Sequence, residues 1–116
     1  MKIAVPLDET KEKICVTFAR APYVMFDEDG VRTIMENPAA DAQGGAGPKA
    51  AQFIADNNAD VLITVRCGEN AAVVLKAAEM KIMKNDGEDA VENIEKYKEG
   101  KLDELSHFHA GFHGVM

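Results

Sequence analysis

The stretch NPAADAQGGAGPKAA, residues 37–51, decides how this chain of 116 residues folds. Gly44, Gly45 and Gly47 leave the backbone almost without steric restriction. Pro48 then takes the place of a first helical residue, where its fixed φ and its missing N–H are no loss. Apolar residues follow at helical spacing. A flexible loop therefore leads into a helix N-terminus, where free N–H groups and the positive end of the helix dipole can meet an anion.

The same glycines also fit a simpler interpretation, in which they only make a tight connection. The loop is not a P-loop, because no Gly-Lys-Ser/Thr follows it. It is not a dinucleotide fingerprint either, because Ala50 stands where the third glycine would be. The turn thus offers affinity for an anion or a cluster without specifying a nucleotide.

The residues before this loop predict a β-rich first third. Residues 2–6 and 23–27 are short apolar strands, and residues 31–36 form a third. Asp29-Gly30 between the last two is the strongest short signal for a hairpin. Residues 14–18 are β-branched and brief, which fits an extended segment or an irregular strand.

The residues after the loop alternate between helix and strand. Helices are expected at about 48–57, 71–79 and 87–98, and strands at 60–65 and 80–83. The strand at 60–65 is apolar throughout, which is typical of a central parallel strand. The helix at 71–79 is apolar nearly all round, so we expect it to be largely buried. The sum predicts an α/β fold: three layers, α/β/α, with a mixed five-stranded sheet.

Composition limits the possible functions. Residues 1–105 are long enough for one domain with its own core, and residues 106–116 are expected to be a flexible, histidine-containing tail. Asp and Glu outnumber Lys and Arg by 20 to 13, a net charge of −7, which argues against nucleic acid as a partner. No apolar run has the length of a membrane span and no signal peptide is evident, so we expect a cytoplasmic protein. No exposed apolar stripe is evident, which favours a monomer.

Cys67 is the most informative candidate residue. It directly follows the apolar strand and precedes a helix N-terminus, a position that lowers a thiol pKa, and Arg66 would lower it further. A thiolate there is a soft ligand for a metal or an iron–sulfur type cluster, or a redox nucleophile. An inert buried thiol is the alternative. Ligands in α/β sheets bind beyond the carboxyl ends of parallel strands, where residues 7–17, the glycine loop and residues 66–70 would converge.

Other candidates are weaker. Arg20 is either an exposed cation aimed at an anionic ligand or a solvated edge charge, and Cys15 is expected to be structural. His107, His109 and His113 have a density at which imidazoles chelate Cu, Ni or Zn, although weak adventitious binding is the alternative.

Catalytic patterns are scarce, and we expect a protein that is not an enzyme. GxSxG, HExxH and CxxC are absent, and Ser106 is the only serine. A nuclease of the ribonuclease H type needs carboxylates on its core strands. The first strand has none, because Asp8 lies after it, and the central strand offers only Asp60 at its start.

Several motifs together resemble one known family. They are MKIAVP at 1–6, FARAPY at 18–23, ENPAADAQGGAGPKAAQ at 36–52, DVLITVRCGENA at 60–71, VLKAAEMKI at 74–82 and YKEGKL at 97–102. Their order and spacing resemble the dinitrogenase iron–molybdenum cofactor biosynthesis family, which includes NifX, NafY and the C-terminal domain of NifB. The resemblance runs from Met1 to about Leu102.

The resemblance implies a ribonuclease H-like fold and non-catalytic binding or carriage of a metal–sulfur cluster or its precursor. Relatives of the orange-protein type hold a molybdenum–copper sulfide cluster, and their strand-end loop looks similar to residues 66–68. The chain departs from the family at two places. Thr17 and Ala19 stand where the family often has His and Gly, which removes one candidate ligand, and Glu69 replaces a frequent Pro.

The leading hypothesis is a small protein that binds an anionic metal–sulfur cluster of iron–molybdenum or molybdenum–copper type. Its expected partners are the cluster and a donor or acceptor protein of cluster assembly. Cys67 would ligate or border the cluster, beside Asn70, the glycines would bring backbone N–H groups close, and Arg20 and Arg66 would balance charge. One alternative is a thiol-dependent enzyme acting at Cys67 on a small anionic substrate. Another is a docking module that uses the acidic helix at 87–98.

Overall fold

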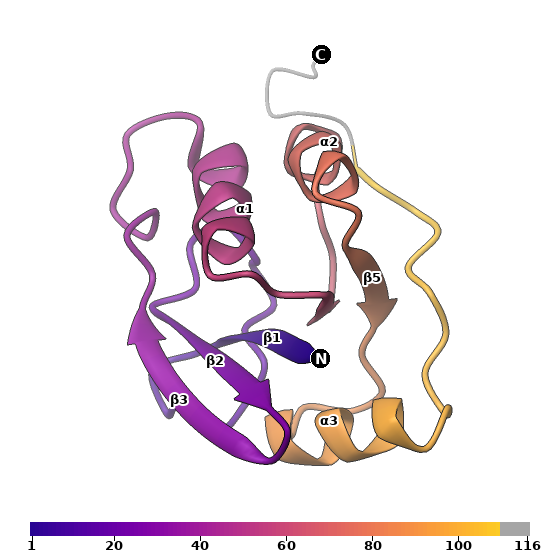
Figure 1. Ribbon diagram of the computed structural model, residues 1–116. Coiled ribbons are helices and arrows are strands. Elements are labelled where there is room, and N and C mark those ends of the chain that lie inside the picture. Colours follow the sequence, from indigo (N-terminus) through magenta and orange to yellow (C-terminus); the bar gives the residue numbers. More distant parts are fainter. Residues whose placement is uncertain (110–116) are drawn as a thin grey trace.

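A mixed five-stranded sheet forms the middle layer of the protein in the computed structural model, which describes residues 1–109 (Figure 1). The strands are β1 (Lys2–Leu7), β2 (Tyr23–Glu28), β3 (Val31–Glu36), β4 (Val61–Thr64) and β5 (Lys81–Lys84), and the helices are α1 (Ala46–Asp56), α2 (Glu69–Ala77) and α3 (Ala90–Lys98). Their order in the sheet is β3-β2-β1-β4-β5. The first three pair antiparallel, and β1, β4 and β5 pair parallel.

The predicted hairpin is confirmed. Asp29 and Gly30 connect β2 to β3 with φ values of 54° and 89°, and two consecutive positive φ angles suit the right-handed twist of the flanking strands. The register pairs Glu28 with Val31 and continues to Tyr23 with Glu36.

The strands alternate their side chains between two separate cores, which confirms the three-layer α/β/α prediction. One core lies under α1 and α2, and its strand residues are Ala4, Val24, Phe26, Leu62 and Ile82. The other lies under α3, and its strand residues are Ile3, Val5, Leu7, Met25, Val61, Ile63 and Met83. Figure 1 shows α1 and α2 side by side on one face of the sheet and α3 on the other. Successive residues of a strand point to opposite faces, so each inner strand serves both cores.

Two local expectations were wrong. The helix α2 is buried only along Ala71, Ala72 and Leu75, and Val73 is 68% exposed, because α2 covers one face of the sheet and its other side meets solvent. The helix α1 begins at Ala46 rather than at Pro48, with Gly45 as its N-cap. All residues of β3 are exposed, the apolar ones together with the polar ones, and the monomeric state stays a prediction.

The chain after α3 packs along the edge of β5 instead of leaving the domain. Leu105 N donates to Ile82 O (2.9 Å), Lys84 N donates to Asp103 O (2.8 Å), and Phe108 packs against the core under α1 and α2. Figure 1 shows this segment in yellow, running from α3 past β5 toward α2. Of the predicted flexible tail, residues 106–116, the structure describes residues 106–109, and His113 lies outside the described residues.

None of the helices within residues 1–109 combines the length and the apolar character that crossing a membrane requires.

Candidate functional site

A hollow of about 790 Å³ lies at the carboxyl end of β4, at the N-termini of α1 and α2. Its wall is made by residues 17–20, residues 43–48, residues 66–71 without Glu69, and His109. We call it the arginine hollow. The structure brings together here all seven residues that the sequence nominated for cofactor binding: Arg20, Gly44, Gly45, Gly47, Arg66, Cys67 and Asn70. Their role in binding stays a prediction.

Two helix N-termini lie at this hollow. The N-cap of α1 is Gly45, in the left-handed region at φ 64°, and the N-cap of α2 is Gly68, and neither has a side-chain cap. In contrast, the Asp89 carboxylate caps α3 by accepting from Glu92 N (2.8 Å). The first N–H groups of a helix have no partner within it, so uncapped N-termini present partial positive charge to whatever lies in front of them. The hollow is therefore built to meet an anion.

The charged side chains of the wall have one sign. Arg20 and Arg66 line the hollow, and the wall contains no Asp or Glu. Within residues 1–109, the Arg66 guanidinium forms no hydrogen bond or ion pair. The arrangement places a cation without a fixed protein partner at the mouth of the site.

Arg20 also has a structural role that the sequence analysis did not predict. One of its terminal nitrogens donates to Ala40 O (3.2 Å) and Ala42 O (2.8 Å), which ties the loop before α1 to the segment after β1. Asn37, which is buried, strengthens the same connection. Its side-chain amide donates to Ala19 O (3.0 Å) and Ala21 O (2.9 Å). An Asn followed by Pro is a turn signal that could have indicated this role.

Cys67 does not behave as the sequence suggested. It is only 1% exposed, and burial raises the pKa of its thiol from 9.0 to about 11, against the opposing charge of Lys76. The expectation of a lowered pKa is wrong because desolvation of the charged thiolate outweighs the helix N-terminus and the neighbouring cation. At neutral pH the thiol is therefore protonated. A metal that binds it must displace a proton.

His109 reaches the hollow through a contact of the C-terminal segment. It forms a parallel bridge with Gly68 and lines the wall beside Cys67. A Cβ on Gly68 would lie 3.0 Å from Cε1 of His109, so a larger residue at this position would require the ring to shift by a few tenths of an ångström. His107 does not line the hollow, and residues 1–109 contain no group of three or more His, Cys, Asp or Glu side chains arranged to hold a metal ion. Chelation by His107, His109 and His113 stays a prediction.

Cys15, expected to be structural, is half-buried. Its sulfur lies 3.9 Å from the hydroxyl oxygen of Thr17. It is not part of the wall of the arginine hollow, although Thr17 is. Nothing in its surroundings distinguishes it as a ligand.

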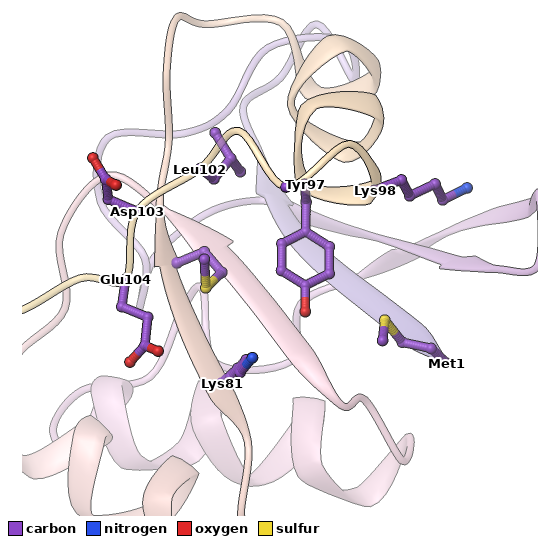
Figure 2. A pocket seen from close by; sticks show the side chains of 9 residues that line it. Met1, Lys81, Tyr97, Lys98, Leu102, Asp103 and Glu104 are labelled. Carbon is purple, nitrogen blue, oxygen red and sulfur yellow. The ribbon is translucent and has the colours of Figure 1, made fainter.

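A second hollow of about 690 Å³ lies on the other face of the sheet, beside the C-terminal end of α3. Figure 2 shows Tyr97 projecting from α3 toward the strands, with Lys98 and Met1 on one side and Asp103 and Glu104 on the other. We call it the tyrosine hollow. Both signs of charge stand on its rim, and Lys98 is paired with the buried carboxylate of Asp27 (3.2 Å).

Comparison with protein families assigns the chain. The family described as dinitrogenase iron-molybdenum cofactor matches residues 1–100. The chain belongs to this family. The resemblance in the sequence motifs is thereby confirmed, and the family points to a function related to the iron–molybdenum cofactor of dinitrogenase.

Solved structures of similar proteins agree with this assignment. A candidate NifB protein from Thermotoga is 33% identical, with a TM-score of 0.77, and the match covers 92% of this chain and 95% of that one. The apo form of the orange protein from Desulfovibrio gigas is 24% identical, with a TM-score of 0.82, and the match covers 90% of this chain and 92% of that one. A candidate dinitrogenase from Methanocaldococcus jannaschii is 20% identical, with a TM-score of 0.72, covering 92% and 96%. The last two show the shared fold. No curated protein matches the chain.

Proposed function

We propose that this member of the dinitrogenase iron-molybdenum cofactor family binds and carries an anionic metal–sulfur cluster, or a precursor of it, in the arginine hollow. One observation carries the proposal: a chain of net charge −7 forms a hollow walled by two arginines and by two helix N-termini that lack a side-chain cap, with no carboxylate. Such a wall attracts an anion and does not suit a bare metal cation.

The residues divide the work of binding. Arg66 has no protein partner among residues 1–109, and its guanidinium donates hydrogen bonds to the sulfide or oxide atoms of the ligand. The N–H groups of Ala46 and Gly47, which precede the first bonded amide of α1 (Lys49 N to Gly45 O, 3.1 Å), donate from a second direction. Asn70 stands in the first turn of α2 and can donate from its side chain.

Cys67 lies in the wall of the hollow, and its protonated thiol sets how it takes part. As a neutral thiol it borders the cluster. It becomes a ligand only where a soft metal of the cluster displaces its proton. Binding through charge and backbone N–H groups suits a carrier, because the cluster can then be transferred without breaking several metal–ligand bonds.

The two alternative functions have less support. A thiol nucleophile needs a thiolate at working pH, and burial of Cys67 opposes it. A docking role for the acidic helix needs free carboxylates, but Glu95 pairs with Arg32 (3.2 Å) and Glu88 lies 4.0 Å from Lys13, which leaves Glu92 as the carboxylate of the three without an ion pair among the described residues. We therefore propose a non-catalytic carrier that exchanges its cluster with a donor or acceptor protein. We keep the monomeric state and the cytoplasmic location as part of the proposal.

An anaerobic amide NMR titration with tetrathiomolybdate, with and without Cu(I), tests the proposal. We expect saturable shifts confined to residues 17–20, 43–48 and 66–71. Shifts restricted to the histidines of the C-terminal residues would show that the folded domain does not hold the anion. That outcome would overturn the proposal.

A further inference from the structure

His109, at the end of the segment of residues 102–109, lines the arginine hollow, and the family motifs, which end at about residue 102, do not explain this position. We infer that His109 contacts the bound anion, and that docking of this segment and ligand binding reinforce each other. The inference rests on the proposed function. It assigns to one histidine of the tail a role that the other histidines do not share.

Two backbone hydrogen bonds fix His109 in the wall of the site. His109 N donates to Cys67 O (3.2 Å), and Glu69 N donates to His109 O (2.9 Å). The two bonds lie on either side of Gly68, the N-cap of α2. The backbone of His109 is thus hydrogen-bonded to the loop that contains Arg66. The position of the His109 ring therefore depends on the docking of this segment.

The missing side chain of Gly68 gives the ring its place. The Cε1, Nε2 and Nδ1 atoms of His109 lie 3.0, 3.5 and 3.6 Å from where a Cβ of Gly68 would be. The ring therefore lies over the glycine backbone, at the wall of the hollow. Gly68 has φ −79°, a value that any residue adopts, so close approach of the ring and not backbone strain explains the glycine.

The rest of the segment makes few contacts with the domain. Phe108 packs against the core with Lys76 Nζ 4.4 Å from its ring centre, and Leu105 N donates to Ile82 O. Ordering each residue of the segment costs backbone entropy, so a few such contacts leave docking only weakly favourable. A ligand that contacts His109 stabilises the docked state of the segment. By linkage, undocking of the segment must lower the affinity for the ligand by the same factor by which the ligand favours docking.

The segment also leaves the remaining donors of α2 for the ligand. The carbonyl of His109 accepts the N–H of Glu69, the first residue of the helix. The N–H groups of Asn70 and Ala71 come next, and a helix gives them no partner of its own. The docked segment therefore adds the His109 side chain to a wall that already contains the N-termini of α1 and α2 and the Arg66 side chain.

Three variants test the inference by tetrathiomolybdate titration under anaerobic conditions. His109→Ala is expected to weaken binding about tenfold, and His107→Ala, the matched control, to change it less than twofold. Gly68→Ala keeps every donor but displaces the ring, and is expected to weaken binding several-fold. Wild-type affinity in both His109→Ala and Gly68→Ala would overturn the inference and leave the proposed function intact, whereas a wild-type protein that does not bind would overturn the proposed function itself.

Amide hydrogen exchange on the wild-type chain tests the coupling separately. At a tetrathiomolybdate concentration tenfold above Kd, exchange of the His109 and Glu69 amides is expected to slow about tenfold. The Ala90 amide, bonded to Glu12 O on the other face of the sheet, is the control and should not change. Unchanged exchange at His109 and Glu69 under saturating ligand would show that docking and binding are independent.

Discussion

The arginine hollow and the tyrosine hollow have similar volumes, about 790 and 690 Å³, but different electrostatic character. The first lies at the N-termini of two helices and has two arginines and no carboxylate. The second lies at the C-terminal end of α3, the negative end of a helix dipole, and has both signs on its rim.

The two hollows also differ in the ion pairs that their cationic side chains form. Lys98 in the tyrosine hollow is 3.2 Å from Asp27, a fully buried carboxylate that also pairs with Arg32 (3.0 Å). Arg66 in the arginine hollow has no such partner within the described part of the chain. Lys98 therefore serves the fold, whereas Arg66 is available to a ligand. Lys81, which also lines the tyrosine hollow, forms no ion pair among the described residues, but it shares that lining with Asp103 and Glu104. The volume of a hollow therefore says less about its ligand than the signs of the charges that line it.

The largest effect is expected on the fold, at Asp27. Asp27→Asn removes the charge that joins the β2–β3 hairpin to α3, and should lower the free energy of unfolding by about 3 kcal/mol, since it leaves Arg32 and Lys98 without their buried partner. Urea unfolding measures it. Asp29→Asn, at an exposed carboxylate, is the control, expected within about 0.5 kcal/mol. Tetrathiomolybdate affinity should not change in the folded fraction. A loss of affinity would show that the two faces of the sheet are coupled.

The next effect is expected on binding, at Arg66. Arg66→Ala should weaken tetrathiomolybdate binding by about ten- to a hundredfold, because a hydrogen bond to a charged group contributes about 1.5–3 kcal/mol. Calorimetric titration at fixed ionic strength measures it. Lys98→Ala, the matched change in the tyrosine hollow, should leave affinity within twofold. Equal losses in the two variants would mean that net charge alone attracts the ligand, and the contrast between the hollows would be lost.

A smaller effect is expected from pH, through Cys67. The pKa of the thiol is about 11 in the folded protein and 9.0 as its ordinary value. Between pH 9 and 11 the unfolded chain loses this proton first. The free energy of unfolding should therefore fall as pH rises, by at most about 1.4 kcal/mol per pH unit. Urea unfolding of Cys67→Ala, compared with Cys15→Ala, isolates this term. The same slope in both variants would contradict the raised pKa.

The smallest effect is expected on the outer surface of α2. Val73→Thr should change the free energy of unfolding by less than about 0.5 kcal/mol, because Val73 is 68% exposed. The matched change Ala72→Thr inserts a larger, polar side chain into a buried position and should cost more. Similar values for the two would mean that Val73 is covered by a partner in solution.

Much of the fold could be predicted from the sequence because its signals are local. Alternating apolar residues mark the strands, and Asp29-Gly30 marks the hairpin. The burial of α2 could not be predicted, because a run of alanines and valines is apolar on every side whichever side packs. The exposure of β3 likewise depends on its place at the edge of the sheet, which is a property of strand order.

The site was partly predictable for the same reason. The glycine loop and the loop after β4 both follow from topology, since ligands collect at the carboxyl ends of parallel strands. The pKa of Cys67 could not be predicted, because desolvation depends on the packing around it. The position of His109 could not be predicted either. It depends on a long-range contact between its ring and Gly68, and a glycine has no side chain that would mark this contact in the sequence.

The strand order also determines how this chain reaches its native state. β1 lies in the middle of the sheet, and its two neighbours are β2, which follows closely in sequence, and β4, whose Val61 pairs with Ile3. The β2–β3 hairpin can form early, but the parallel half of the sheet must wait for a long loop to close. We therefore expect refolding to be limited by the β1–β4 pairing, so that mutations there slow folding, whereas mutations in the docked segment Leu102–His109 mainly speed unfolding.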